Sequence, residues 1–250
     1  MKSLIISVAG SSTRFNRDTK TDVLKCLYYE ESAEYSLLYQ QVCKVYDDVD
    51  EIIIVGGYKY DDLVLFFDNQ LKEFKSKIKL IYNEHYHDYG SGYSLIKGLD
   101  SVSEQAQEVV FIEGDLFFDK TSLQELINSN RDVISINNET IKADKAVALY
   151  FDANHYPHYL YDTQHSCLSI NEPFTAIYNS AQMWKFINVD KLQKIRQTLM
   201  PDQLKGTNLV TIQLYFEDLP EESIDIIQIN DWYNCNTVDD YLAVYNHLIK

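Results

Sequence analysis

Residues 4–15 read LIISVAGSSTRF, and this stretch gives the first indication of the fold class of the whole chain. A short run of Leu, Ile and Val without polar alternation is typical of a strand buried on both faces, as in a parallel sheet. The run ends at Gly10 and small polar residues, which predicts a tight loop at the end of the strand. We therefore expect a first buried strand here rather than a signal peptide, because the apolar part is too short and contains serine.

Similar apolar runs recur along the first half of the chain and alternate with segments whose apolar residues have helical spacing. The runs are residues 51–55, 78–82, 109–113 and 133–136, and the helical segments are residues 35–46, 60–74, 93–99 and 122–127. This order predicts an α/β fold with a doubly wound, mostly parallel sheet. Every proline lies beyond residue 150, so we expect the second portion to be more irregular and to complete a pocket. No linker rich in Gly, Ser or Pro divides the chain, so we expect a single domain.

Charge and composition exclude several classes of protein. The 250-residue chain has 22 Lys and Arg against 38 Asp and Glu, a formal net charge of −16, which argues against a nucleic-acid partner. No apolar run reaches the roughly 20 residues that a spanning helix needs, so no membrane insertion is expected. The four cysteines form no close pair, which indicates neither a disulfide framework nor a thiolate zinc site and favours the cytoplasm.

The loop after the first strand gathers positive charge in an acidic protein. Backbone amides at residues 10–13 can approach phosphate oxygens, while Arg14 and Lys25 add cations. The alternative is an ordinary surface turn with solvated charges. The loop is neither a Walker A sequence nor a G-x-G-x-x-G fingerprint, which disfavours P-loop ATPases and NAD enzymes.

Two later segments are expected at the same edge of the sheet. Residues 90–95, GSGYSL, place a glycine-rich turn before Ser94 at a helix start, which suits contact with a nucleobase or simply caps the helix. Residues 109–115 end a central strand at Asp115, where a carboxylate can hold Mg²⁺ or cap the next helix. Asp119 is a second candidate for a cap or a supporting contact.

These segments together resemble nucleotidyltransferases that act on sugar phosphates and choline phosphate. Residues 8–15 with Val23-Leu24-Lys25 are similar to that family's triphosphate loop, with a single glycine and with leucine where proline is usual. Residues 90–95 are similar to the CTP-dependent branch, and Glu113-Gly114-Asp115 is similar to an E-G-D segment of the family as a whole. The resemblance implies a GT-A-like fold and catalysis by Arg14, Lys25 and Asp115. The nucleotide-binding residues that it implies are Ala9, Gly10, Ser11, Ser12, Thr13, Arg14, Lys25, Gly92, Tyr93 and Ser94.

The resemblance also implies a Mg²⁺ cofactor held by Asp115 and by a residue near the C-terminus. Asn236 stands where the family has an aspartate, and its amide oxygen can coordinate Mg²⁺ without charge. Thr237 followed by Asp240 predicts the N-cap of a closing helix.

The second portion is rich in tyrosines and acids, which suit a cationic acceptor or pack between sheet and helices. Glu172 and Tyr178 are the candidate acceptor-binding residues. A zinc site near Cys167 is not expected, because the spacing of the nearby histidines matches no common ligand motif. These histidines are His155, His158 and His165.

The activity implied is that of a Mg²⁺-dependent cytidylyltransferase, which joins CTP and a small phosphorylated acceptor and releases pyrophosphate. The acceptor stays open among choline phosphate, a phosphonate, a polyol or sugar phosphate, and a phosphorylated amino acid amide such as glutamine phosphate. Products of the related bacterial enzymes imply a role in capsule or lipopolysaccharide biosynthesis. In this interpretation residues 1–137 form a nucleotide-binding portion of the single domain 1–250, and residues 138–250 form an acceptor-binding portion with the metal-site segment.

Two alternatives come from other classes of protein. A nucleotide-binding protein without catalysis is suggested by Asn236, and a metal-dependent glycosyltransferase using a nucleotide sugar is suggested by Asp115 and Asp119. The sequence leaves a homodimer open.

Overall fold

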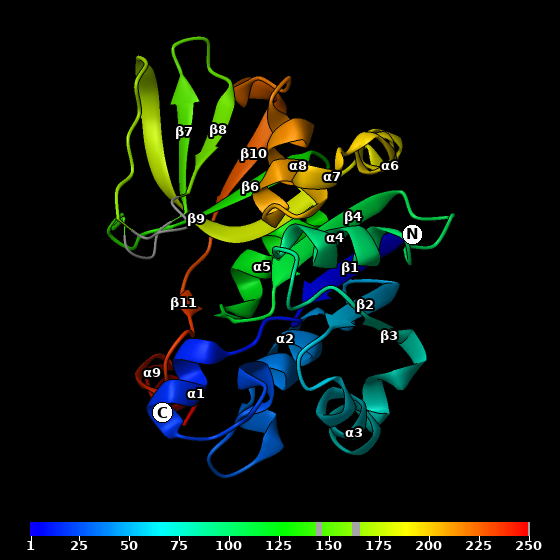
Figure 1. The fold of residues 1–250 in the computed structure, drawn as a ribbon. Helices are drawn as coiled ribbons and strands as arrows, with labels where there is room; N and C mark the ends of the chain where they lie inside the picture. The colour runs from blue at the N-terminus through cyan, green and yellow to red at the C-terminus, as the bar shows by residue number, and fades with distance from the viewer. Residues whose placement is uncertain (144–146, 162–165, 250) are drawn as a thin grey trace.

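A mixed sheet runs through the centre of the computed structural model, which describes residues 1–143, 147–161 and 166–249 (Figure 1). Its strands follow the order β10-β6-β9-β4-β1-β2-β3, and β7 and β8 extend it from β9. β9 pairs antiparallel with β4, β6 and β7, whereas β1 pairs parallel with β2 and β4. The strands are β1 (Lys2–Ser7), β2 (Glu51–Gly56), β3 (Ile78–Tyr82), β4 (Glu108–Glu113), β5 (Leu116–Phe117), β6 (Asp132–Asn137), β7 (Ala148–Asp152), β8 (Pro157–Leu160), β9 (Phe174–Phe186), β10 (Ile224–Gln228) and β11 (Tyr233–Asn234).

Helices cover both faces of the sheet because successive strand residues point to opposite sides. Leu4 and Ile6 of β1 pack in one apolar cluster with α2 and α5, whereas Ile5 packs in the other with α4, α6 and α8. The α-helices are α1 (Thr13–Thr19), α2 (Leu37–Val45), α3 (Tyr60–Gln70), α4 (Gly92–Leu99), α5 (Lys120–Asn128), α6 (Val189–Thr198), α7 (Pro201–Leu204), α8 (Asn208–Phe216) and α9 (Val238–Leu248). Four 3₁₀ turns within the described residues are η1 (Lys25–Leu27), η2 (Ala33–Tyr35), η3 (Lys72–Lys77) and η4 (Glu221–Ser223).

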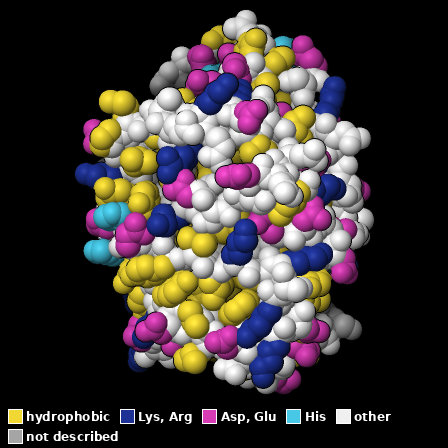
Figure 2. Space-filling view, turned by 90° about the vertical axis from the view of Figure 1, so that its right-hand side faces the viewer, with side chains coloured by type: hydrophobic (Ala, Val, Ile, Leu, Met, Phe, Trp, Pro, Cys, Tyr) yellow, Lys and Arg dark blue, Asp and Glu magenta, His cyan; other side chains and the backbone are white. Residues whose placement is uncertain are grey.

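This architecture confirms the expected α/β fold with a doubly wound, mostly parallel sheet. Each of the predicted apolar runs forms a strand. The first of them is β1, which lies inside the sheet between β4 and β2, where a buried strand was expected. None of the helices in the described ranges has the length and apolar character needed to cross a lipid bilayer. On the face that carries β3 and α6, Lys and Arg are scattered among Asp and Glu and form no continuous basic patch (Figure 2).

The closing helix α9 begins with the predicted cap. Thr237 Oγ1 accepts a hydrogen bond from the Asp240 backbone N–H (3.2 Å), and Asp240 Oδ2 accepts one from the Thr237 N–H (2.8 Å). These reciprocal bonds satisfy backbone donors that the first turn of a helix leaves free. Tyr241 of α9 packs edge-on against Tyr28, which in turn contacts Phe15 of α1. The start of α9 is thereby fixed beside the first loop.

Loss of this cap should lower the stability of the protein. We expect Thr237→Ala to reduce the free energy of unfolding by about 1 kcal/mol, because the Asp240 N–H loses its acceptor. Urea unfolding followed by circular dichroism measures the loss. Thr237→Ser keeps the hydroxyl and is the matched control, so an equal loss in both variants would contradict the capping role.

Candidate functional site

The site lies where β1 and β4 end side by side. The two strands are parallel and in register, with Ser7 opposite Glu113. Gly114 continues this contact, because its N–H donates to the Ser7 carbonyl at 2.8 Å. A Cβ on residue 114 would lie 2.5 Å from the same oxygen, so only glycine permits this approach. The loop after β1 and the turn that carries Asp115 therefore meet at one edge of the sheet.

The first loop is tied to the segment that carries Lys25. Ser12 is the N-cap residue of α1 in a left-handed conformation, and its hydroxyl accepts a hydrogen bond from the Lys25 N–H at 3.0 Å. Asn16 Oδ1 accepts from the Val23 N–H at 3.0 Å, and Phe15 is buried beneath the loop. The predicted phosphate loop and Lys25 are thus one structural unit.

Four of the predicted residues meet in one polar cluster. Lys25 Nζ lies 2.8 Å from Asp115 Oδ2 and 3.0 Å from Asn236 Oδ1. Arg14 Nη2 donates to the same Asn236 oxygen at 2.9 Å. The cluster brings together residues more than 200 positions apart, because β11 pairs with β5 and the Cys235 N–H donates to the Asp115 carbonyl at 2.8 Å.

The cluster offers a suitable place for a hard cation. Asp115 Oδ2 and Asn236 Oδ1 both point at the Lys25 ammonium, so two oxygens already converge on positive charge. Within the described ranges, no group of three or more His, Cys, Asp and Glu side chains is arranged for a metal. One carboxylate and one amide oxygen suit Mg²⁺, which keeps several water or phosphate ligands.

Among the described residues, three cavities adjoin the cluster, and two of them are lined by Asp115. The first, of about 280 Å³, is lined by the predicted residues Ala9, Gly10, Ser11, Lys25, Ser94 and Asp115 and also by Asn83, Tyr86 and Tyr89. The second, of about 160 Å³, is lined by Arg14, Asp115 and Asn236 together with Gln182, Trp184 and Asn208. Ser91, Glu113 and Asp115 line both, so the carboxylates stand at the boundary between the two cavities.

The remaining predicted nucleotide-binding residues support this edge rather than line the first cavity. Gly92 packs against the turn before α8, where its N–H donates to the Gly206 carbonyl at 3.1 Å. The Tyr93 hydroxyl donates to Glu84 at 3.3 Å, and the exposed Thr13 hydroxyl contacts Ser11 at 2.9 Å. Ser94, unlike these residues, lines the first cavity; it is buried and accepts a hydrogen bond from Asn83 Nδ2 at 2.9 Å.

The two candidate acceptor-binding residues lie elsewhere, on the β7–β8–β9 arm. Glu172 is exposed and accepts a hydrogen bond from the Tyr150 hydroxyl at 2.7 Å, while Tyr178 packs edge-on against Phe151. Neither lines the two cavities beside Asp115.

The described histidines that were considered for a zinc site, and Asp119, contact other residues of the protein. His155 Nδ1 lies 2.7 Å from Glu221, and His158 Nε2 lies 3.5 Å from Asp152, whereas His165 falls outside the described residues. Asp119 caps α5, because its Oδ1 accepts from the Ser122 N–H at 2.9 Å.

Comparison with protein families gives one match over nearly the whole chain. Residues 21–248 match the model of the family described as "Domain of unknown function (DUF6564)". The chain belongs to this family. A search of curated protein sequences gave no match.

Solved structures share the fold of this DUF6564 chain. The CTP:phosphocholine cytidylyltransferase of Streptococcus pneumoniae superposes with a TM-score of 0.64 and 16% identity, covering 99% of each chain. The inositol-1-phosphate CTP transferase of T. maritima gives 0.69 and 14%, over 98% of this chain and 95% of that one. A UDP-glucose pyrophosphorylase gives 0.73 and 14%, over 100% and 98%. The fold is therefore of the expected nucleotidyltransferase type.

The structure adds Glu113 and Asn208 to the site. Glu113 lies at the end of β4, lines both cavities, and accepts a hydrogen bond from Asn208 Nδ2. Burial raises the pKa of Glu113 to about 8, and the neighbouring Asp115 carboxylate adds to the rise. The sequence offers a signal for Glu113, which stands two residues before Asp115, but none for Asn208, which comes from the start of α8.

The Glu113 carboxyl should make stability depend on pH. The pKa of an unperturbed glutamate is 4.5, so between pH 4.5 and 8 the folded protein keeps a proton that the unfolded chain releases. Stability should therefore fall as pH rises through this range. Glu113→Gln cannot ionise and keeps the oxygen that accepts from Asn208, so we expect it to be more stable than the wild type by about 1–3 kcal/mol at pH 8.

Urea unfolding at pH 5 and pH 8 tests this expectation. The exposed Glu125→Gln on α5 is the control for loss of a carboxylate. A gain at pH 8 that is no larger than that of the control would contradict the raised pKa of Glu113.

Proposed function

We propose that the protein is a cytidylyltransferase that joins CTP and a small phosphorylated acceptor to give a CDP-linked product and pyrophosphate. The observation that carries this proposal is the meeting of Arg14, Lys25, Asp115 and Asn236 at the boundary of two cavities. The arrangement gives one cavity for each substrate and places cations between them.

The first cavity has the features of a nucleotide site. Residues 9–11 of the first loop line it, and so does Lys25 of η1. Asn83 and Ser94 form a buried amide–hydroxyl pair in its wall, which can meet the polar edge of a cytosine. Two solved structures with this fold, an inositol-1-phosphate CTP transferase and a CTP:phosphocholine cytidylyltransferase, support the choice of CTP.

The reaction proposed is an in-line displacement at the α-phosphorus of CTP. An oxygen of the acceptor phosphate forms a new bond to that phosphorus, and the bond to the bridging oxygen of pyrophosphate breaks. Catalysis then depends on positioning and on neutralisation of charge rather than on a covalent intermediate. Arg14 and Lys25 neutralise charge on the triphosphate and on the leaving pyrophosphate.

Asp115 and Asn236 would hold Mg²⁺ through the oxygens that converge on Lys25. The ion, when bound, supplies further neutralisation of phosphate charge. Asp115 also orients the Lys25 ammonium, and Asn236 orients both Lys25 and Arg14. We place the activity in the cytoplasm and its product in capsule or lipopolysaccharide decoration.

Pyrophosphate release tests the function. The assay combines Mg²⁺, each of the four nucleoside triphosphates, and a panel of choline phosphate, aminoethylphosphonate, sugar and polyol phosphates, and glutamine phosphate. We expect release only with CTP and one class of acceptor. Asp115→Asn should lower the rate by about 100-fold or more without loss of fold, because it removes charge from the reacting centre. CTP binding without release across the panel, or full activity of Asp115→Asn, would contradict the proposal.

A second carboxylate at residue 236 should strengthen metal binding. We expect Asn236→Asp to lower the Mg²⁺ concentration for half-maximal rate by about tenfold, because affinity for hard cations follows ligand charge. The exposed Asn246→Asp on α9 controls for the added negative charge. An unchanged Mg²⁺ requirement in Asn236→Asp would show that residue 236 does not contact the ion.

A further inference from the structure

Gln182 has an unusual backbone for a residue in the middle of a strand. It lies in β9 with φ of 58°, in the left-handed region that favours glycine. The other described non-glycine residues with positive φ, namely Ser12, Lys20, Lys59, His155 and Asp231, lie at helix ends or in turns. A strained conformation of this kind persists only where the surroundings impose it, and such positions cluster at functional sites.

The surroundings of Gln182 do impose this conformation. Its neighbours Ala181 and Met183 are wholly buried, and the pairing of β9 with β6 shifts register between Ile134 and Ile136. The Ala181 carbonyl accepts from Trp232 Nε1 at 2.9 Å, and Ser135 Oγ bonds both the N–H and the carbonyl of Met183. The backbone is therefore fixed on both sides of Gln182.

The side chain of Gln182 is available to bind a ligand. It lines the second cavity together with Asp115 and Asn236. Its backbone N–H donates to Ser180 Oγ at 3.1 Å, but its amide has no hydrogen-bond partner among the described residues. An amide offers one acceptor and two donors, all suited to an uncharged polar group.

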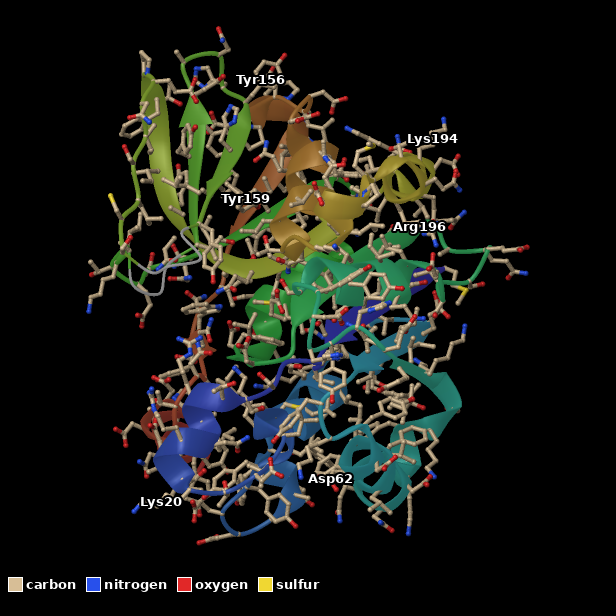
Figure 3. The ribbon with its side chains drawn as sticks, viewed as in Figure 1. Lys20, Asp62, Tyr156, Tyr159, Lys194 and Arg196 are labelled. Atoms are coloured by element: carbon tan, nitrogen blue, oxygen red, sulfur yellow. The ribbon has the colours of Figure 1, made fainter. Side chains whose placement is uncertain are left out.

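Several other residues of this cavity are also uncharged and polar, in addition to the ionisable Arg14, Glu113 and Asp115. Neutral hydroxyl and amide side chains form much of its lining, and these belong to Ser91, Thr207, Asn208 and Asn234. Trp184 presents no open ring face for a trimethylammonium group, because it is wholly buried and stacked on Phe111. Its Nε1 donates at 2.5 Å to the hydroxyl of Tyr159, a residue of β8 whose backbone N–H donates to Gln213 of α8 (Figure 3).

We propose, on the basis of the function proposed above, that Gln182 recognises an uncharged hydrogen-bonding group of the acceptor, a hydroxyl or a carboxamide. An acceptor that lacks such a group leaves the Gln182 amide unpaired in the cavity, which disfavours its binding. Gln182 thus selects sugar, polyol or amide phosphates over choline phosphate.

Gln182→Gly is a favourable test because glycine adopts the observed φ without strain. We expect its melting temperature to equal or exceed that of the wild type. Isothermal titration with a non-hydrolysable CTP analogue present measures binding of glucose 1-phosphate, inositol 1-phosphate, ribitol 5-phosphate, glutamine phosphate and choline phosphate. We expect a hydroxyl or carboxamide compound to bind most tightly and Gln182→Gly to weaken that binding about tenfold, with affinity for the CTP analogue unchanged.

Two further variants sharpen the test. Gln182→Asn keeps an amide and tolerates positive φ, so we expect binding between that of the wild type and Gln182→Gly. Lys20→Gly is the matched control, because Lys20 also has positive φ but lies at the end of α1 away from β9 (Figure 3).

The outcomes separate this inference from the proposed function. Tightest binding of choline phosphate, equal affinities in wild type and Gln182→Gly, or no binding by any compound would overturn it. Binding that depends on Gln182 but gives no pyrophosphate with CTP would support the assignment of Gln182 and contradict only the transferase reaction.

Discussion

The parallel pairing of β1 with β4 is the constraint on which the site depends. Because Ser7 lies opposite Glu113, both strands end at one level, and the next residues of each strand must share the same edge. Gly114 then lets the acidic turn touch the backbone of β1. A slip by one residue would turn every side chain of β4 to the other face of the sheet and move Asp115 away from Lys25. The pairing of β11 with β5 depends on this turn in the same way, and it adds Asn236 to the cluster.

Hydrogen bonding within the cluster explains how the Lys25 ammonium is held at a largely buried place. The Lys25 and Asp115 side chains are only 18% and 22% exposed, so each needs a partner close by. Asn236 shares one oxygen between Lys25 and Arg14, while its own amide nitrogen donates to Asn234 at 2.5 Å. These bonds fix the oxygen toward the cations. In the function we propose, triphosphate oxygens compete for the same two cations, which is why the cluster can serve as a phosphate site without rebuilding the fold.

The sequence predicts the parts of the molecule that local pattern controls. The central parallel strands are uninterrupted Ile and Val runs, and the Thr237 cap is a local signal followed by a helix. The β7–β8–β9 arm is harder to predict, because its residues alternate irregularly and its pairing partners are distant in the chain. Asn208 and Gln182 could not be found for the same reason. Their place at the cavity follows from packing of α8 and from the register shift in β9, and glutamine is not a residue type that signals positive φ.

The neutral residues around the cluster have an electrostatic consequence. The protein carries a net charge of −16, which repels polyanions at long range, yet in the function we propose Arg14 and Lys25 attract phosphates at short range. Near these two cations lie the Asp115 carboxylate and Glu113, whose pKa is raised so that it holds a proton and carries no charge at neutral pH. Amides at residues 234 and 236 supply hydrogen-bonding oxygens without adding negative charge. A carboxylate at either position would cancel one cation, so the amides keep this small region positive within an acidic molecule.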